Sequence, residues 1–243
     1  MNTQNHRCIL AVVAHPDDEV LGCGGTLAAW SRAGAETHVL CLADGETARF
    51  QDRSDAAASV CISARREAAR KAAEILGLSS IRFLDLPDNR MDGMDLLDVV
   101  RPIEALIREI SPDTVYTHHC GDLNQDHRIV HQAVCTACRP LPGASVQRIY
   151  SFETPSSTEW ATEAYGPQFR PNLFVDITET FKHKLSSLKA YNDEMHLFPH
   201  PRSLEGVSVL AHQRGACVGV AAAEAFMLVR ELYAGSSSEK QAS

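Results

Sequence analysis

Two short segments of the chain concentrate the side chains that can carry out chemistry. The first, AHPDDE at residues 14–19, brings one imidazole and three carboxylates directly after the apolar run 8–14. The second, HHCGDLNQDHR at residues 118–128, holds three histidines and two aspartates. Imidazole and carboxylate groups serve as metal ligands and as general acids and bases. The two segments therefore contain the candidate functional residues.

The first segment also has an ordinary interpretation as the start of a helix. Proline at the first helical position and acids in the first turn are common there. That interpretation accounts for residues 16–19 but not for His15. It also leaves the glycines at positions 22, 24 and 25 unexplained, where backbone or a ligand can approach closely. The segment is more typical of a site than of a plain helix start.

If the two segments meet in space, His15, Asp18 and His127 can converge on one ion. Two imidazoles and one carboxylate, with a position left open for water, are a familiar catalytic zinc arrangement. The ligand types also suit Fe²⁺ and Co²⁺. Asp17 is then free to act as a general base, and Asp126 beside His127 is a candidate to orient a ligand. Asp122 and Asn124 have the alternative of capping the following helix.

The elements around the segments predict how they are positioned. Strands are expected at 8–14, 37–43, 81–84, 113–117 and 148–152, with helices at 16–34, 57–76, 94–110 and 124–138 between them. This alternation predicts an α/β fold with a Rossmann-like, doubly wound, mostly parallel sheet of order near 3-2-1-4-5. The first and fourth strands are then neighbours. Both segments lie at their carboxyl ends, at the switch point where such sheets bind ligands.

A single domain, residues 1–243, is expected, with a Rossmann-like part at 1–152. The less regular part at 153–234 is expected to serve substrate binding and oligomer contacts, and 235–243 to be a disordered tail. Within the second part we expect a loop at 153–170, a strand at 174–177 and helices at 179–195 and 202–213. The apolar segment 219–233 fits a helix or a strand.

Composition and charge argue against a nucleic-acid-binding protein, a membrane-spanning protein and a secreted protein. The net charge is −8 and the chain has no basic block, which argues against nucleic acid as a partner. It has no apolar run of about 18 residues, so no integral membrane segment is expected. The polar N-terminus does not match a signal peptide. The eight cysteines include one isolated CxxC, at 135–138, and suit a reducing cytoplasm, where we expect the protein to act.

AHPDDE together with GDLNQDHR resembles the PIG-L/LmbE-like family of zinc-dependent N-acetyl-sugar deacetylases, and the resemblance extends over the whole chain. It implies Zn²⁺ bound by His15, Asp18 and His127, with Asp17 as the base that activates water. It also implies hydrolysis of the acetamide of an N-acetylglucosamine-type amino sugar, free or linked to a nucleotide or a lipid, releasing acetate and the free amine. A homo-oligomer, a trimer or a hexamer, is implied as well.

The chain departs from the family at one position. The family often has H-x-D-H in the second motif, where the first histidine stabilises the oxyanion or protonates the amine. Here that position is Asn124, which can donate a hydrogen bond to an oxyanion but cannot deliver a proton. The expected catalytic residues are Asp17, Asn124, Asp126 and His200, with His118 and His119 as other candidates for the acid.

Further residues are candidates for binding the substrate. They lie on loops beyond strand ends or near His200: Asp88, Arg90, Arg53, His118, His119 and Arg202. Arg65 and Arg66 also qualify as partners for an anionic group, but the helix 57–76 is expected to turn them toward solvent.

Three alternatives remain open. One is an amidase for a conjugate of a glycosylated thiol or natural product, because the ligands do not fix the substrate. A non-catalytic relative is the second, motivated by Asn124. The third, a nucleotide-binding protein, is disfavoured because the glycines at 22, 24 and 25 do not match GxGxxG and acids precede them where phosphates should approach.

Overall fold

The sheet is built outward from β1 (Cys8–Val13), which pairs in parallel with β2 (Glu36–Ala43) on one side and β4 (Thr114–His118) on the other. The computed structural model describes residues 7–50 and 56–233, so Arg53 and the predicted tail lie outside the described residues. The seven strands run in the order β3-β2-β1-β4-β5-β7-β6. The predicted order 3-2-1-4-5 is confirmed, and two strands are added to it.

The remaining strands are β3 (Ser80–Leu86), β5 (Arg148–Phe152), β6 (Leu173–Asp176) and β7 (Ala223–Glu231). The first five strands are parallel, whereas β7 is antiparallel to β5 and β6 is antiparallel to β7. The ambiguous segment 219–233 thus contains a strand. The antiparallel pair extends the sheet beyond β5 with residues from the C-terminal part.

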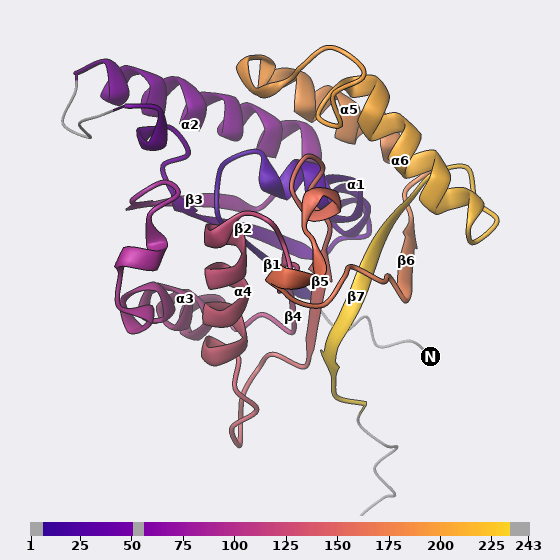
Figure 1. Cartoon of the computed structure of the whole chain (residues 1–243). Helices are drawn as coiled ribbons and strands as arrows, with labels where there is room; N and C mark the ends of the chain where they lie inside the picture. The colour runs from indigo at the N-terminus through magenta and orange to yellow at the C-terminus, as the bar shows by residue number, and fades with distance from the viewer. Residues whose placement is uncertain (1–6, 51–55, 234–243) are drawn as a thin grey trace, which may run out of the picture.

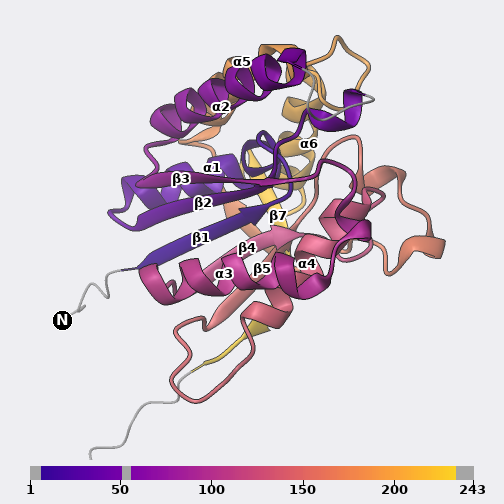
Figure 2. The same cartoon turned by 90° about the vertical axis from the view of Figure 1, so that its left-hand side faces the viewer.

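Helices cover both faces of the sheet (Figures 1 and 2). One face carries α1 (Asp18–Arg32), α2 (Ala56–Leu76), α5 (Phe181–Ala190) and α6 (Leu204–Ala216), and the other carries α3 (Leu96–Ile110) and α4 (Gln125–Ala137). All six residues of β1 are buried, with Leu10 and Val12 packed in the core toward α3 and α4 and the alternate residues packed toward α1. A strand covered on both faces must be apolar throughout, which explains the uninterrupted run in the sequence.

The glycines after the first segment bring α1 close to its neighbours. A β-carbon at Gly22 would fall 2.2 Å from the ring of Phe152, and one at Gly25 would fall 2.8 Å from Ile177. These two glycines therefore allow a helix to pack tightly against side chains from β5 and the end of β6. The sequence predicted a close approach of backbone or a ligand at these glycines, and the structure shows that the close neighbours are the side chains of Phe152 and Ile177.

A buried ion pair joins the C-terminal part to α1. Lys184 of α5 lies 2.5 Å from the Glu224 carboxylate of β7 and donates to the Leu21 carbonyl at 2.8 Å. The same carboxylate accepts the backbone N–H groups of Gly25 and Thr26. Within the described residues, every helix is too short or too polar to cross a bilayer.

Candidate metal centre

The two chemical segments meet at the carboxyl ends of β1 and β4. His15 follows β1, His118 ends β4, and His127 lies in the first turn of α4. The loop after β3 and the loop after β5 close over the same end of the sheet, on the right in Figure 2. The topology thus brings together residues more than 100 positions apart.

His15, Asp18 and His127 form a group that can hold a metal ion. Their ligand atoms all lie within 4.8 Å of one another, and all three side chains are buried. Asp18 Oδ2 lies 3.2 Å from His15 Nδ1 and 3.3 Å from His127 Nε2. Asp18 Oδ1 and His127 Nε2 are buried without a hydrogen-bond partner among the described residues. Buried polar atoms rarely lack a hydrogen-bond partner. A cation bound between the three side chains would give both of these atoms a partner.

The far nitrogen of each histidine is held by carboxylates. His15 Nε2 lies 3.1 Å from Asp88 Oδ1 and 3.3 Å from Asp126 Oδ2, while His127 Nδ1 lies 3.0 Å from Asp122 Oδ1. A carboxylate on one ring nitrogen fixes the orientation of the imidazole and makes the other nitrogen a better metal ligand. His15 Nδ1 and His127 Nε2 are therefore the nitrogens directed at the metal position.

Asp122 holds the imidazole of His127, a role that the sequence did not separate from helix capping. Its carboxylate accepts hydrogen bonds from the Ser157 hydroxyl, from Thr158 Oγ1 at 2.5 Å and from the Asn124 N–H at 2.9 Å. Burial opposes ionisation, but the charge of His127 and these hydrogen bonds hold the pKa of Asp122 well below its usual range. The signal available in the sequence was an aspartate five residues before a candidate ligand histidine.

Replacing Asp122 with asparagine is expected to lower metal affinity by about 10- to 100-fold, because His127 loses the carboxylate that orients it. Competition with a chromogenic chelator measures the effect. Asp92→Asn is the matched control, since Asp92 is exposed and accepts a hydrogen bond from the side-chain amide of Gln125, away from His127. Equal affinities for the two variants would contradict the assignment.

Asp17 lies beside the metal group in an unusual backbone conformation. Its φ is 120°, which non-glycine residues rarely adopt. The Asp17 N–H donates to Glu19 Oε2 at 2.9 Å, and the Tyr191 hydroxyl donates to the other oxygen of Glu19. These contacts stabilise the turn, and the turn makes the adjacent side chains of Asp17 and Asp18 point in different directions.

The Asp17 carboxylate has one engaged oxygen and one available oxygen. Oδ2 lies 3.2 Å from Arg202 Nη1 and 3.5 Å from Arg65 Nη2, whereas Oδ1 is buried without a hydrogen-bond partner among the described residues. Burial raises the pKa of Asp17, and the charges of Arg202 and Arg65 limit the rise. An oriented carboxylate with a free oxygen is suited to accept a proton.

Comparison with known sequences identifies the family. The sequence model described as PIG-L: GlcNAc-PI de-N-acetylase matches residues 10–138, more than half of the chain, and this range includes both chemical segments. The chain belongs to the PIG-L family.

Individual relatives extend the similarity into the C-terminal part. The uncharacterized deacetylase YaiS of Escherichia coli is 33% identical over 75% of this chain and 89% of its own length. The probable N-acetyl-alpha-D-glucosaminyl L-malate deacetylase 2 of Bacillus cereus is 27% identical, covering 77% and 84%.

A hydratase of Pseudomonas putida is also similar to this PIG-L family member. The 4-oxalmesaconate hydratase of strain KT2440 is 30% identical over 82% of this chain and 78% of its own length. The structure of GalB, the 4-carboxy-2-hydroxymuconate hydratase of the same strain, superposes with a TM-score of 0.75 at 26% identity, covering 94% and 98%. The proteins similar to this chain are therefore named for more than one reaction, deacetylation and hydration.

Asn124 and Asp126 are both tied to the loop after β3. Asn124 is the N-cap of α4: its Oδ1 accepts the Asp126 N–H at 2.8 Å, and its Nδ2 donates to Asn89 Oδ1 at 3.0 Å. The Asp126 carboxylate accepts the N–H groups of Asn89 and Met91 as well as contacting His15. Asn124 therefore caps the helix, which was the alternative to a catalytic role. To donate a hydrogen bond to an oxyanion, its amide nitrogen would first have to break its hydrogen bond with Asn89.

His118 and His119 are both buried. His118 stacks on His127 with ring centroids 3.8 Å apart, and its Nε2 accepts the Ala14 N–H at 2.9 Å. His119 Nε2 lies 2.7 Å from the Pro167 carbonyl. Because both imidazoles are buried and bonded to other groups of the protein, we expect them to stabilise the site and not to contact the substrate.

Arg202 reaches the site from the loop before α6, and His200 lies in the same loop. Arg202 contacts Asp17 and also donates to Ser156 Oγ at 2.7 Å. His200 accepts the Arg202 N–H on Nδ1, and its ring contacts Trp160 edge-on at 5.8 Å. Burial, together with nearby cationic groups, lowers the pKa of His200. Only Arg202 of the two touches the Asp17 carboxylate.

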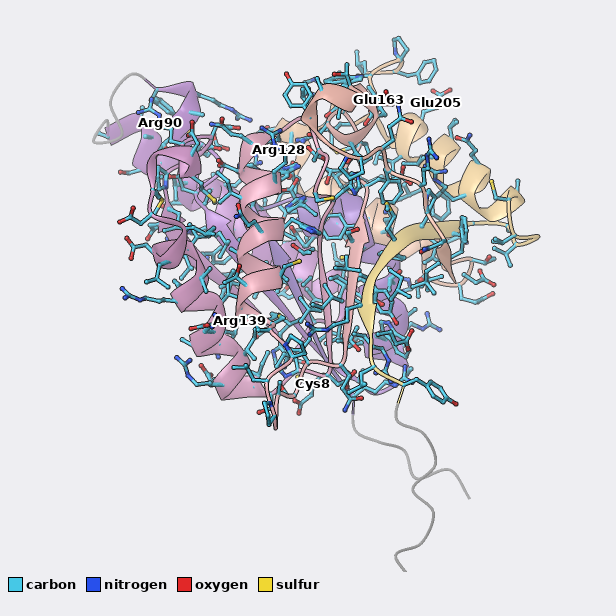
Figure 3. The ribbon with its side chains drawn as sticks, turned by 60° about the horizontal axis from the view of Figure 1, so that its bottom comes forward. Cys8, Arg90, Arg128, Arg139, Glu163 and Glu205 are labelled. Atoms are coloured by element: carbon cyan, nitrogen blue, oxygen red, sulfur yellow. The ribbon has the colours of Figure 1, made fainter. Side chains whose placement is uncertain are left out.

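The loop after β3 places Asp88 and Arg90 differently. Asp88 is buried against His15, whereas Arg90 is exposed at the upper edge in Figure 3.

The prediction for Arg65 was wrong. Its side chain is only 6% exposed, donates to the Pro16 carbonyl at 2.9 Å and contacts Asp17, Glu46 and Glu194. Its neighbour Arg66 is the more exposed of the two.

Proposed function

We propose that this chain is a metal-dependent N-deacetylase that hydrolyses the acetamide of an N-acetylated amino sugar, with Zn²⁺ held by His15, Asp18 and His127. The observation that carries the proposal is the position of Asp17 Oδ1, which lies next to that ligand group and has no hydrogen-bond partner in the described part of the chain. Membership of the PIG-L family supports the reaction, and the Bacillus cereus relative supports a glucosaminide as substrate.

The residues of the chain supply the proton transfers. Asp17 Oδ1 accepts the proton of the attacking water while Arg202 and Arg65 hold Oδ2 in place. Zinc, when bound, lowers the pKa of a coordinated water to about 7 and polarises the amide carbonyl. The protonated Asp17 is then the nearest donor for the departing amine. His200, with its lowered pKa, is a weaker candidate for that step.

The test combines metal content with acetate release. Purified protein is expected to contain zinc that is lost in a His15→Ala variant, and to release acetate from N-acetylglucosamine or its UDP-linked form. Chelation is expected to stop the reaction and zinc to restore it. Protein that retains full activity after its metal is removed would overturn the proposal, and zinc-loaded protein inactive on a panel of N-acetylated sugars would exclude this substrate class.

A second candidate function is hydration of a conjugated carbon–carbon double bond. The similarity to the 4-oxalmesaconate hydratase favours it. Hydration adds the hydroxyl of water to one carbon and a proton to the other, and Asp17, once protonated by the attacking water, would return that proton to the second carbon. The same activated water and Asp17 base would serve both reactions. Loss of ultraviolet absorbance from an unsaturated keto acid substrate, without acetate release from N-acetyl sugars, would select the hydratase.

A further inference from the structure

A thiol, a carboxylate and an imidazole gather at the opposite end of the sheet from the metal centre. Cys8 is the first residue of β1 and is the register partner of Glu36, the first residue of β2. His38 lies two residues further along β2, and residues two apart in a strand point to the same face. Parallel pairing therefore places Cys8, Glu36 and His38 on one face, the face covered by α3.

We propose that Cys8, Glu36 and His38 form a second metal site, for Zn²⁺ or a similar borderline divalent cation. Their ligand atoms, one from each residue, all lie within 4.8 Å of one another. A thiolate, an imidazole and a carboxylate are all zinc ligands, and three of them leave one position for water.

The contacts of His38 direct one ring nitrogen into this group. Its Nδ1 lies 2.8 Å from Ser80 Oγ, the hydroxyl of its register partner in β3. Its Nε2 is buried without a hydrogen-bond partner among the described residues and lies 3.8 Å from Glu36 Oε2. The ring is thus held on one side and offers an unused nitrogen on the other, as metal-ligating histidines do.

The surroundings of Cys8 suit a cation better than a bare thiolate. Among the described residues, its Sγ donates one weak hydrogen bond, at 3.4 Å, to the Ile110 carbonyl at the end of α3, and its N–H donates to Asp113. Burial, with the negative charges of Glu36 and Asp113, raises the pKa of the Cys8 thiol to about 11. The same charges attract a divalent ion, and binding would displace the thiol proton.

The site is separate from the catalytic group. At a rise of about 3.3 Å per residue, β1 places Cys8 roughly 20 Å from His15. Figure 3 shows Cys8 at the lower end of the sheet, with Arg90 and Arg128 of the catalytic end at the top. A metal here would fasten β1 to β2 and take no part in the chemistry.

Cobalt substitution distinguishes the two sites, because only the second contains sulfur. Metal-free protein titrated with Co²⁺ is expected to bind two ions per chain and to develop a thiolate-to-cobalt charge-transfer band. Cys8→Ser should lose the band and one ion while keeping its deacetylase activity. His15→Ala should keep the band and lose the other ion, so this result is independent of the proposed function.

Control variants distinguish the loss of the Cys8 ligand from the effects of other cysteines and from misfolding. Cys217→Ser removes an exposed thiol and should leave both ions and the band unchanged. His38→Gln should lose the band even if Cys8→Ser folds poorly, and circular dichroism checks the fold of each variant. One cobalt per chain in the wild type without the band, or a band that survives in Cys8→Ser, would overturn the proposal.

Discussion

Asp17→Asn is expected to reduce kcat by about 10²- to 10⁴-fold, the usual contribution of a positioned general base. Asparagine keeps the size of the side chain but cannot accept the proton that Oδ1 is placed to receive. Metal content should stay at the wild-type level, because Asp17 is outside the ligand group. Turnover of the amide substrate and metal analysis of the same sample measure the two effects separately.

Asp18→Asn provides the matched control for that experiment. Asp18 is adjacent in sequence and also buried, but its carboxylate contacts the imidazoles of His15 and His127. Its replacement should lower metal content and activity together, whereas Asp17→Asn should lower activity alone. Wild-type turnover by Asp17→Asn would show that another group removes the proton from water.

Arg65→Ala is expected to lower the free energy of unfolding by about 3–5 kcal/mol, the usual cost of removing one partner from a buried charge network. The guanidinium lies between the carboxylates of Asp17, Glu46 and Glu194, each of them buried. Without it, these buried carboxylates lose the cation that they share, and the cations that still contact them among the described residues are Arg202 and the half-exposed Arg49. Denaturant unfolding of the metal-free protein isolates this effect from metal binding.

Arg66→Ala is the natural comparison, because it removes the same side chain one position along α2. Arg66 is 26% exposed and pairs with Asp85, which is 70% exposed, so about 1 kcal/mol or less is expected. Arg65→Lys should fall between the two alanine variants, since lysine keeps the charge but not the planar fork of donors. Equal losses for Arg65→Ala and Arg66→Ala would mean that the buried network does not contribute to stability.

The metal group was predictable because local sequence and sheet topology together determine it. Apolar runs of strand length, alternating with helices, allow few topologies other than a parallel sheet with β1 beside β4. Once those strands are neighbours, residues that follow them must meet at their carboxyl ends. His15, Asp18 and His127 come together for that reason, without any detail of side-chain packing.

The C-terminal part was less predictable for a related reason. Residues 219–233 are apolar and alanine-rich, and such a run fits a buried helix as well as a strand. Only the position of β5, whose free edge accepts β7 in antiparallel orientation, decides between them. The same pairing brings Glu224 to Lys184, a contact between residues 40 positions apart that no local pattern indicates.

The sequence alone therefore determined the order of the first five strands and the three residues that can hold the metal, because both follow from periodicity and from motifs at strand ends. The tertiary structure decided which groups surround them. Asp122 proved to hold His127, Arg65 to lie under Asp17, and Cys8 to meet His38. Each of these contacts depends on the register of strands and on which face of a helix is buried. Those features are set by packing between distant segments, since a charged residue on a helix looks the same in sequence whether it faces solvent or a buried carboxylate.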